Sequence, residues 1–133
     1  MKLSLDKRQL CDIQGRLFEL AVKNGYDSKD FISKFMNSNT AKKLDDSYDR
    51  LQWSGEEYIL EELVDEVKTI NKNGEVYSIE VMYWMGYIYR YWHYYTNELS
   101  KEIYAIANAE TMNLSWLGFH TLDVEMAIDK LKN

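Results

Sequence analysis

The chain has 133 residues with no proline, a single cysteine (Cys11) and a formal net charge of −6. This length predicts one domain, residues 1–133, and the absence of proline predicts an all-α protein because nothing interrupts helical hydrogen bonding. The negative charge disfavours binding to nucleic acid. The first ten residues lack the apolar segment of a signal peptide, and no apolar run is long enough to span a membrane. We therefore expect a cytoplasmic protein without disulfides.

Residues 4–74 are expected to form three helices and a shorter helical segment. The first helix begins at the capping residue Ser4 and ends at Asn24-Gly25, where glycine accepts a left-handed conformation. A second helix follows Asp27-Ser28, and a segment from Thr40 places Leu44, Tyr48 and Leu51 on one face. The third full helix begins with a capping box at Ser54–Glu57, in which Ser and Glu side chains pair with backbone N–H groups. It is expected to end at Asn73-Gly74.

Residues 78–133 are expected to contain the remaining helices of a compact bundle of about six. Ser78 caps an aromatic helix that continues to about Tyr95. A short helix begins at Ser100, and the last helix begins near Thr121 and carries an apolar stripe to the C-terminus.

The two halves, residues 4–74 and 78–133, share a pattern typical of two diverged three-helix repeats. Tyr48–Leu63 aligns with Trp116–Leu131, and the sequence SKDFI at Ser28 matches SKEIY at Ser100. The alternative is that amphipathic helices of similar composition align by chance.

The aromatic helix contains eight Tyr or Trp residues between Tyr83 and Tyr95. At 100° per residue these positions separate into three faces. The core face holds Val81, Trp84, Met85, Ile88 and Trp92. A second face, which we call the tyrosine stripe, holds Tyr83, Tyr87, Tyr91 and Tyr94. A third, narrower face holds Gly86, Arg90 and His93.

The tyrosine stripe has two main interpretations, because a phenol combines apolar area with a hydroxyl that needs a partner. It closes the seam between the two halves, or it contacts another chain, either a second copy or a different protein. In the second case Arg90 and His93 join Tyr83, Tyr87, Tyr91 and Tyr94 as partner-binding residues. Stacking on single-stranded bases is a third interpretation, which the acidic charge disfavours.

Few residues are candidates for metal binding or catalysis. One cysteine and two histidines, His93 and His120, form no recognised zinc pattern, so we expect no metal and no cofactor. Arg90 and His93 resemble the Arg-x₄₋₆-His signature of small helical ribonucleases, but only two residues separate them here. Gly86 inside the aromatic helix indicates close approach of another helix.

The stretch Ser100–Leu131 combines a Ser-x-Glu-hydrophobic helix start with an aromatic-His-Thr turn and a terminal acidic helix. It resembles a family of short helical bacterial proteins of unassigned function that are encoded beside ADP-ribosyltransferase-like toxins. The matching residues are Ser100, Glu102, Ile103, Tyr104, His120 and Thr121. The resemblance implies an antitoxin or accessory role, with the toxin as partner. The first half carries Gln52-Trp53 where His120-Thr121 stands in the second.

The expected function is therefore a non-enzymatic protein-binding module that neutralises a toxin by contact. Two alternatives are open. The helix from Ser100 could be the recognition helix of a helix-turn-helix regulator, although Lys101, Glu102 and Asn108 supply little positive charge for phosphates. The other alternative is a small helical nuclease built around Arg90 and His93.

Overall fold

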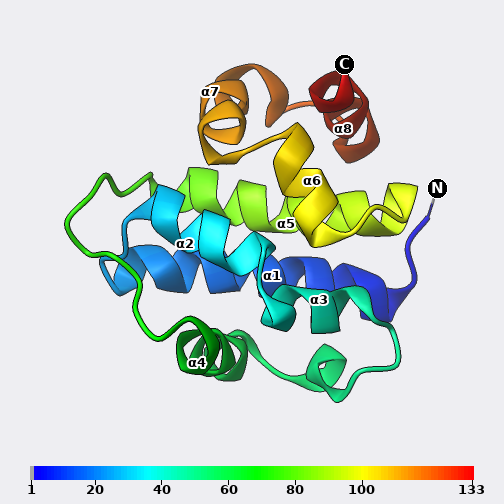
Figure 1. The fold of residues 1–133 in the computed structure, drawn as a ribbon. Coiled ribbons are helices and arrows are strands. Elements are labelled where there is room, and N and C mark those ends of the chain that lie inside the picture. The colour runs from blue at the N-terminus through cyan, green and yellow to red at the C-terminus, as the bar shows by residue number, and fades with distance from the viewer. Residues whose placement is uncertain (1) are drawn as a thin grey trace.

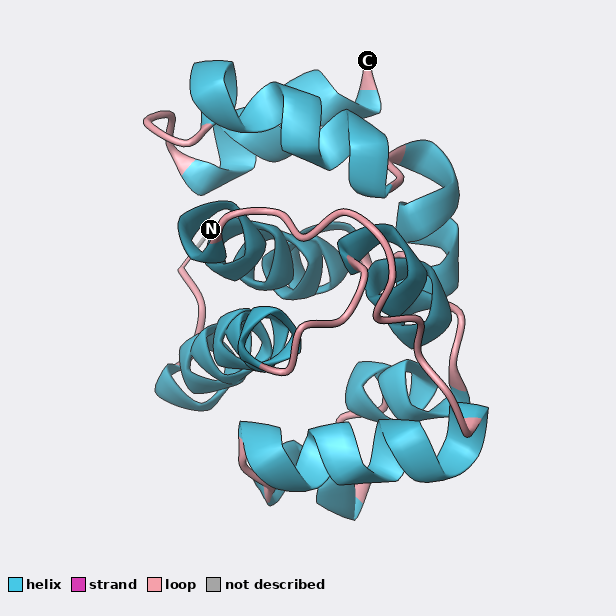
Figure 2. Ribbon diagram, turned by 90° about the vertical axis from the view of Figure 1, so that its left-hand side faces the viewer, coloured by secondary structure: helices cyan, strands magenta, loops and turns pink. Residues whose placement is uncertain are grey.

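The computed structural model describes residues 2–133, and within this range all regular structure is helical (Figures 1 and 2). The elements, in chain order, are α1 (Leu5–Lys23), α2 (Ser28–Met36), α3 (Asn39–Asp45), the 3₁₀ helix η1 (Arg50–Trp53), α4 (Glu56–Val67), α5 (Ile79–Thr96), α6 (Ser100–Ile106), α7 (Ala109–Phe119) and α8 (Val124–Lys132). The all-α class is confirmed, with eight α-helices in the described chain rather than about six.

The centre of the fold is the antiparallel pair of the two longest helices, α1 and α5, which pack more extensively than any other pair (Figure 1). Helix α4 packs on the outer side of α1, and α6, α7 and α8 pack on α5. Two glycines allow the central pair to approach closely. A Cβ atom at Gly86 would lie only 2.4 Å from the backbone oxygen of Gln14, and one at Gly15 would lie 2.7 Å from the ring of Tyr83. The close approach expected at Gly86 is therefore present.

The core is continuous and largely aromatic around α1. The ring of Phe18 meets Phe31 edge-on at 5.2 Å, Phe35 at 5.6 Å and Tyr89 at 6.1 Å between ring centroids. Such edge-to-face pairs stabilise a core beyond their buried area. Helices α1, α2 and α5 are thus joined by one buried cluster.

Several helix boundaries agree with the sequence prediction. The Ser4 hydroxyl accepts from the Lys7 N–H and caps α1, and the Ser78 hydroxyl accepts from the Val81 N–H and caps α5. Gly25 follows α1 with a φ of +73°, the left-handed conformation expected of a glycine there. These boundaries depend on neighbours in sequence, which explains why they were predictable.

Both ends of α4 differ from the prediction. The helix begins after Gly55 rather than with a Ser54 capping box, and it ends at Val67 instead of reaching Asn73. Residues 68–78 instead form a loop on the side of the fold that faces the viewer in Figure 2. The backbone oxygens of Asn71 and Glu75 accept from the N–H groups of Asp27 and Ser28. The loop therefore supplies hydrogen bonds that the start of α2 would otherwise lack.

The segment after α3 also differs. Helix α3 ends at Asp45, and residues 46–49 form turns in which Asp46 and Asp49 accept from the N–H groups of Tyr48 and Leu51. Short acidic side chains compete in this way with helical hydrogen bonds. As a result Tyr48 leaves the face of Leu44 and is 95% exposed.

Helix α7 is a further element that the sequence prediction lacks. It also changes the proposed repeat, because Trp116 lies within α7 while its aligned residue, Tyr48, lies in a turn. The later parts of the aligned segments, α4 and α8, are both helices. The repeat stays a prediction.

None of the helices in residues 2–133 combines the length and the apolar character needed to cross a bilayer.

Candidate functional site

The tyrosine stripe lies along a seam where α5 meets α1 and α8. The rings of Tyr83, Tyr87 and Tyr91 follow one another at centroid distances of 6.2 and 6.4 Å. At one end the Tyr83 hydroxyl donates to Asp12 of α1, and at the other the Tyr91 hydroxyl donates to Glu125 of α8 at 2.8 Å. Both hydroxyls are thus used inside the molecule, although all three rings keep some exposed surface.

Tyr94 completes the stripe near the start of α1. The Lys7 ammonium lies 5.2 Å from the centre of its ring, a cation–π contact. Burial raises the pKa of Tyr94 to about 12, and burial together with the neighbouring carboxylates also raises the pKa values of Tyr83 and Tyr91. The phenols therefore stay protonated at neutral pH and act as hydrogen-bond donors.

Arg90 is not on the surface where a partner could reach it, contrary to our expectation. It is fully buried, and its guanidinium donates to Gln14 of α1 at 2.9 Å, Asp45 of α3 at 2.7 Å and Ser100 of α6 at 3.2 Å. Asp45 also accepts from the N–H and hydroxyl of Ser100. The narrow face of α5 was assigned correctly, but it points toward α1, α3 and α6. Arg90 therefore holds four helices together.

The two histidines have structural contacts. Nδ1 of His93 lies 2.7 Å from the backbone oxygen of Glu98 and 3.8 Å from the Asp45 carboxylate. Burial and the nearby Arg90 lower the pKa of His93, so the ring is mainly neutral at pH 7. Nδ1 of His120 lies 2.6 Å from the backbone oxygen of Trp116, and the two rings stack at 4.0 Å. The structure does not present His93 and Arg90 together to a phosphate.

Cys11 lies among the buried residues of α1, where burial raises the pKa of its thiol to about 12. A thiol that stays protonated at neutral pH is a poor nucleophile. Across residues 2–133, no group of three or more His, Cys, Asp or Glu side chains is arranged to hold a metal ion.

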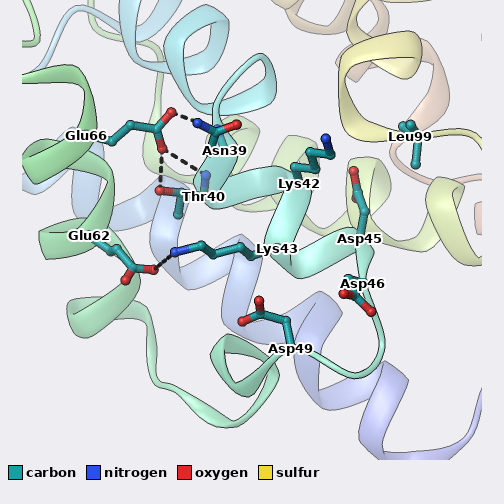
Figure 3. Close-up of a pocket in the computed structure, with 10 residues that line it drawn as sticks. All are labelled: Asn39, Thr40, Lys42, Lys43, Asp45, Asp46, Asp49, Glu62, Glu66 and Leu99. Atoms are coloured by element: carbon teal, nitrogen blue, oxygen red, sulfur yellow. Dashed lines mark hydrogen bonds and ion pairs between the residues drawn. The ribbon is translucent and has the colours of Figure 1, made fainter.

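An open pocket of about 630 Å³ lies between α3 and α4 (Figure 3). Most of its charged groups take part in contacts within the fold. Glu66 of α4 accepts from the backbone N–H groups of Asn39 and Thr40, at 2.7 and 2.9 Å, and from the Thr40 hydroxyl. Lys43 forms an ion pair with Glu62 at 3.7 Å. The pocket therefore shows how α4 caps the N-terminus of α3.

Glu66→Gln is expected to lower the free energy of unfolding by about 1 kcal/mol at pH 7, the typical contribution of a helix cap. Partial burial raises the pKa of Glu66, but the hydrogen bonds from Asn39 and Thr40 outweigh this effect and bring the pKa below its ordinary value of 4.5. A lowered pKa stabilises the fold above that value, so the difference between wild type and variant should narrow as the pH falls below about 4.5. Urea unfolding at several pH values measures this.

Glu62→Gln is the matched control, because Glu62 lies one turn away on α4 and takes part in a partly exposed ion pair. We expect a change of less than about 0.5 kcal/mol. Equal effects of the two substitutions would contradict the capping role of Glu66.

The clearest unpartnered surface is the outer face of α7. Leu114 and Leu117, spaced three residues apart on one face, are 75% and 77% exposed. A Cβ atom at Gly118, beside Leu117 on the helix, would meet open space. The inner side of α7 is occupied separately, with Ala109 and Met112 buried against the core. We call Leu114, Leu117 and Gly118 the α7 outer face.

A second group of exposed apolar residues surrounds η1. Trp53 is 76% exposed and borders a pocket of about 320 Å³ beside the start of α1, whose wall also includes Leu10 and Tyr94. Tyr58, on the first turn of α4, is 56% exposed. These residues belong to different walls of the fold, so they form a less regular surface than the α7 outer face.

Sequence reasoning missed the α7 outer face because α7 is apolar on both sides. A search for one apolar stripe fails in such a segment. Asn108, a residue type that favours helix caps, was the available signal, and its side chain accepts from the Thr111 N–H at 3.0 Å.

The comparisons of the chain with protein-family models, with curated proteins and with solved structures found no match.

Proposed function

We propose that the chain is a non-enzymatic protein-binding module that neutralises a toxin partner by contact. The observation that carries this proposal is the α7 outer face, where two leucines of one helix stay about three-quarters exposed although the core is complete. Burying a leucine side chain contributes about 1.5–3 kcal/mol. Two adjacent leucines can therefore anchor a complex, and exposed apolar patches often mark protein-binding surfaces.

The tyrosine stripe has a secondary place in the proposal. Its rings are partly exposed, but Tyr83 and Tyr91 already donate to Asp12 and Glu125. A partner that reached the stripe would meet partly exposed rings, of which two already have their hydroxyls engaged. The resemblance of Ser100–Leu131 to proteins encoded beside ADP-ribosyltransferase-like toxins supports a toxin as partner, and α7 lies inside that stretch.

The test is growth rescue. The adjacent gene is sequenced first, and the proposal expects it to encode a toxin-like enzyme. That enzyme is then expressed from an unrelated promoter, so that repression of its own promoter cannot explain a rescue, and the chain is supplied from a second plasmid. We expect restored growth and co-purification of the two proteins. Growth arrest despite full expression of the folded chain would refute the proposal. Rescue only when the toxin keeps its native promoter would instead support the DNA-binding alternative.

A further inference from the structure

We infer that the α7 outer face binds a basic amphipathic helix of the partner protein. This inference rests on the proposed function and adds the chemistry of the partner segment. The shape of the surface is the first argument. Leu114 and Leu117 stand one helical turn apart, and the open glycine beside them, Gly118, lets a second backbone come close. A helix that lays an apolar stripe across another helix uses this spacing.

Charge is the second argument. Residues 73–129 contain two cationic side chains, Arg90 and Lys101, and Arg90 is buried and paired with Asp45. Lys101 is thus the single exposed Lys or Arg of this segment. The same segment contains eight carboxylates: Glu75, Glu80, Glu98, Glu102, Glu110, Asp123, Glu125 and Asp129. Residues 73–129 therefore carry a formal charge of −6, and residues 73–133, which also include Lys130 and Lys132, carry −4 of the net charge of −6. This excess of carboxylates favours a cationic partner.

Acidic residues precede and follow the α7 outer face in the chain. Glu110 lies four residues before Leu114, on the same side of α7, and its side chain is 67% exposed. Its carboxylate lies 3.7 Å from the Lys29 ammonium of α2, and both side chains of this ion pair are exposed to solvent. A cation of a partner could therefore replace Lys29. Asp123 is exposed four residues beyond the end of α7, and its carboxylate also caps α8 by accepting from the Glu125 N–H. A helix with leucines along one stripe and Lys or Arg beside it would match both features.

Charge also separates this partner from two other occupants. A second copy would bring the same carboxylates to the contact, and like charges facing each other disfavour association. An anionic membrane surface would be repelled for the same reason. A basic helix is the occupant that gains from both the apolar and the acidic residues.

The experiment uses a fluorescein-labelled synthetic peptide of about 18 residues, long enough for a helix, with leucines on one face and lysines on the other. Fluorescence anisotropy measures its binding to the full chain. A peptide with glutamate in place of every lysine and a scrambled Leu/Lys peptide are the ligand controls. The protein variants are L114Q/L117Q and, as matched control, Leu5→Gln, which changes a leucine that is 60% exposed on α1.

We expect the basic peptide to bind wild type and Leu5→Gln alike, and L114Q/L117Q to weaken binding at least about tenfold. The glutamate and scrambled peptides should bind at least about tenfold more weakly. Absence of binding to wild type, or equal binding to L114Q/L117Q, would overturn the inference. So would sedimentation showing that the chain dimerises through Leu114 and Leu117. A chain that rescues growth but does not bind the peptide keeps the proposed function and loses this inference.

Discussion

Arg90→Leu is expected to lower the free energy of unfolding by about 3–5 kcal/mol, the effect of removing one partner from a buried ion pair. The reason is the position of Asp45, whose side chain is 4% exposed and whose carboxylate would lose the buried guanidinium that pairs with it. Gln14 and Ser100 would each lose a hydrogen-bond partner as well. Urea unfolding followed by circular dichroism measures the change.

Two further variants separate the charge from the loss of packing. Arg16→Leu removes an arginine of α1 whose guanidinium pairs with Asp12 at the surface, at 3.0 Å, and we expect a change of less than about 1 kcal/mol. Asp45→Asn in the Arg90→Leu background removes the buried charge while the side-chain oxygen can still accept from the Ser100 N–H. The double variant should therefore be more stable than Arg90→Leu alone. Additive losses in the two positions would contradict the ion-pair account.

Gly86→Ala is expected to lower the free energy of unfolding by about 1–3 kcal/mol, the usual penalty for overpacking. The new methyl group would lie 2.4 Å from the backbone oxygen of Gln14 and 2.9 Å from the Cα atom of Gly15. These are backbone atoms of α1, so relief requires α1 and α5 to move apart. The same shift would strain the hydrogen bond from the Gln14 amide to the Gly86 oxygen, now 3.0 Å long.

The control for this prediction is Gly118→Ala on the α7 outer face, where a Cβ atom meets nothing within 4 Å. Alanine is the better helix former, so this substitution should raise the free energy of unfolding by up to about 1 kcal/mol. Opposite signs for the two Gly→Ala changes are expected in thermal or urea unfolding. A Gly86→Ala protein as stable as wild type would show that α1 and α5 tolerate a wider separation.

The sequence by itself determined the helical class and the features that depend on near neighbours. Ser4 and Ser78 cap helices through N–H groups three residues away, and Gly25 ends α1 through its own backbone conformation. The division of α5 into faces was also predictable, because the angle between successive residues is a property of the helix. Gly86, Arg90 and His93 do share one face.

Only the tertiary structure decided what each face meets. Arg90 can be buried because its guanidinium donates to Gln14, Asp45 and Ser100. These residues are 76, 45 and 10 positions away in the chain, so only the folded structure brings them to Arg90. Helix α4 ends early because the loop that follows α4 lies against the start of α2, where its backbone oxygens accept from the N–H groups of Asp27 and Ser28. Leu114 and Leu117 are exposed because the core already accommodates the other side of α7. Local periodicity describes a helix surface, whereas burial depends on which distant residues complete it.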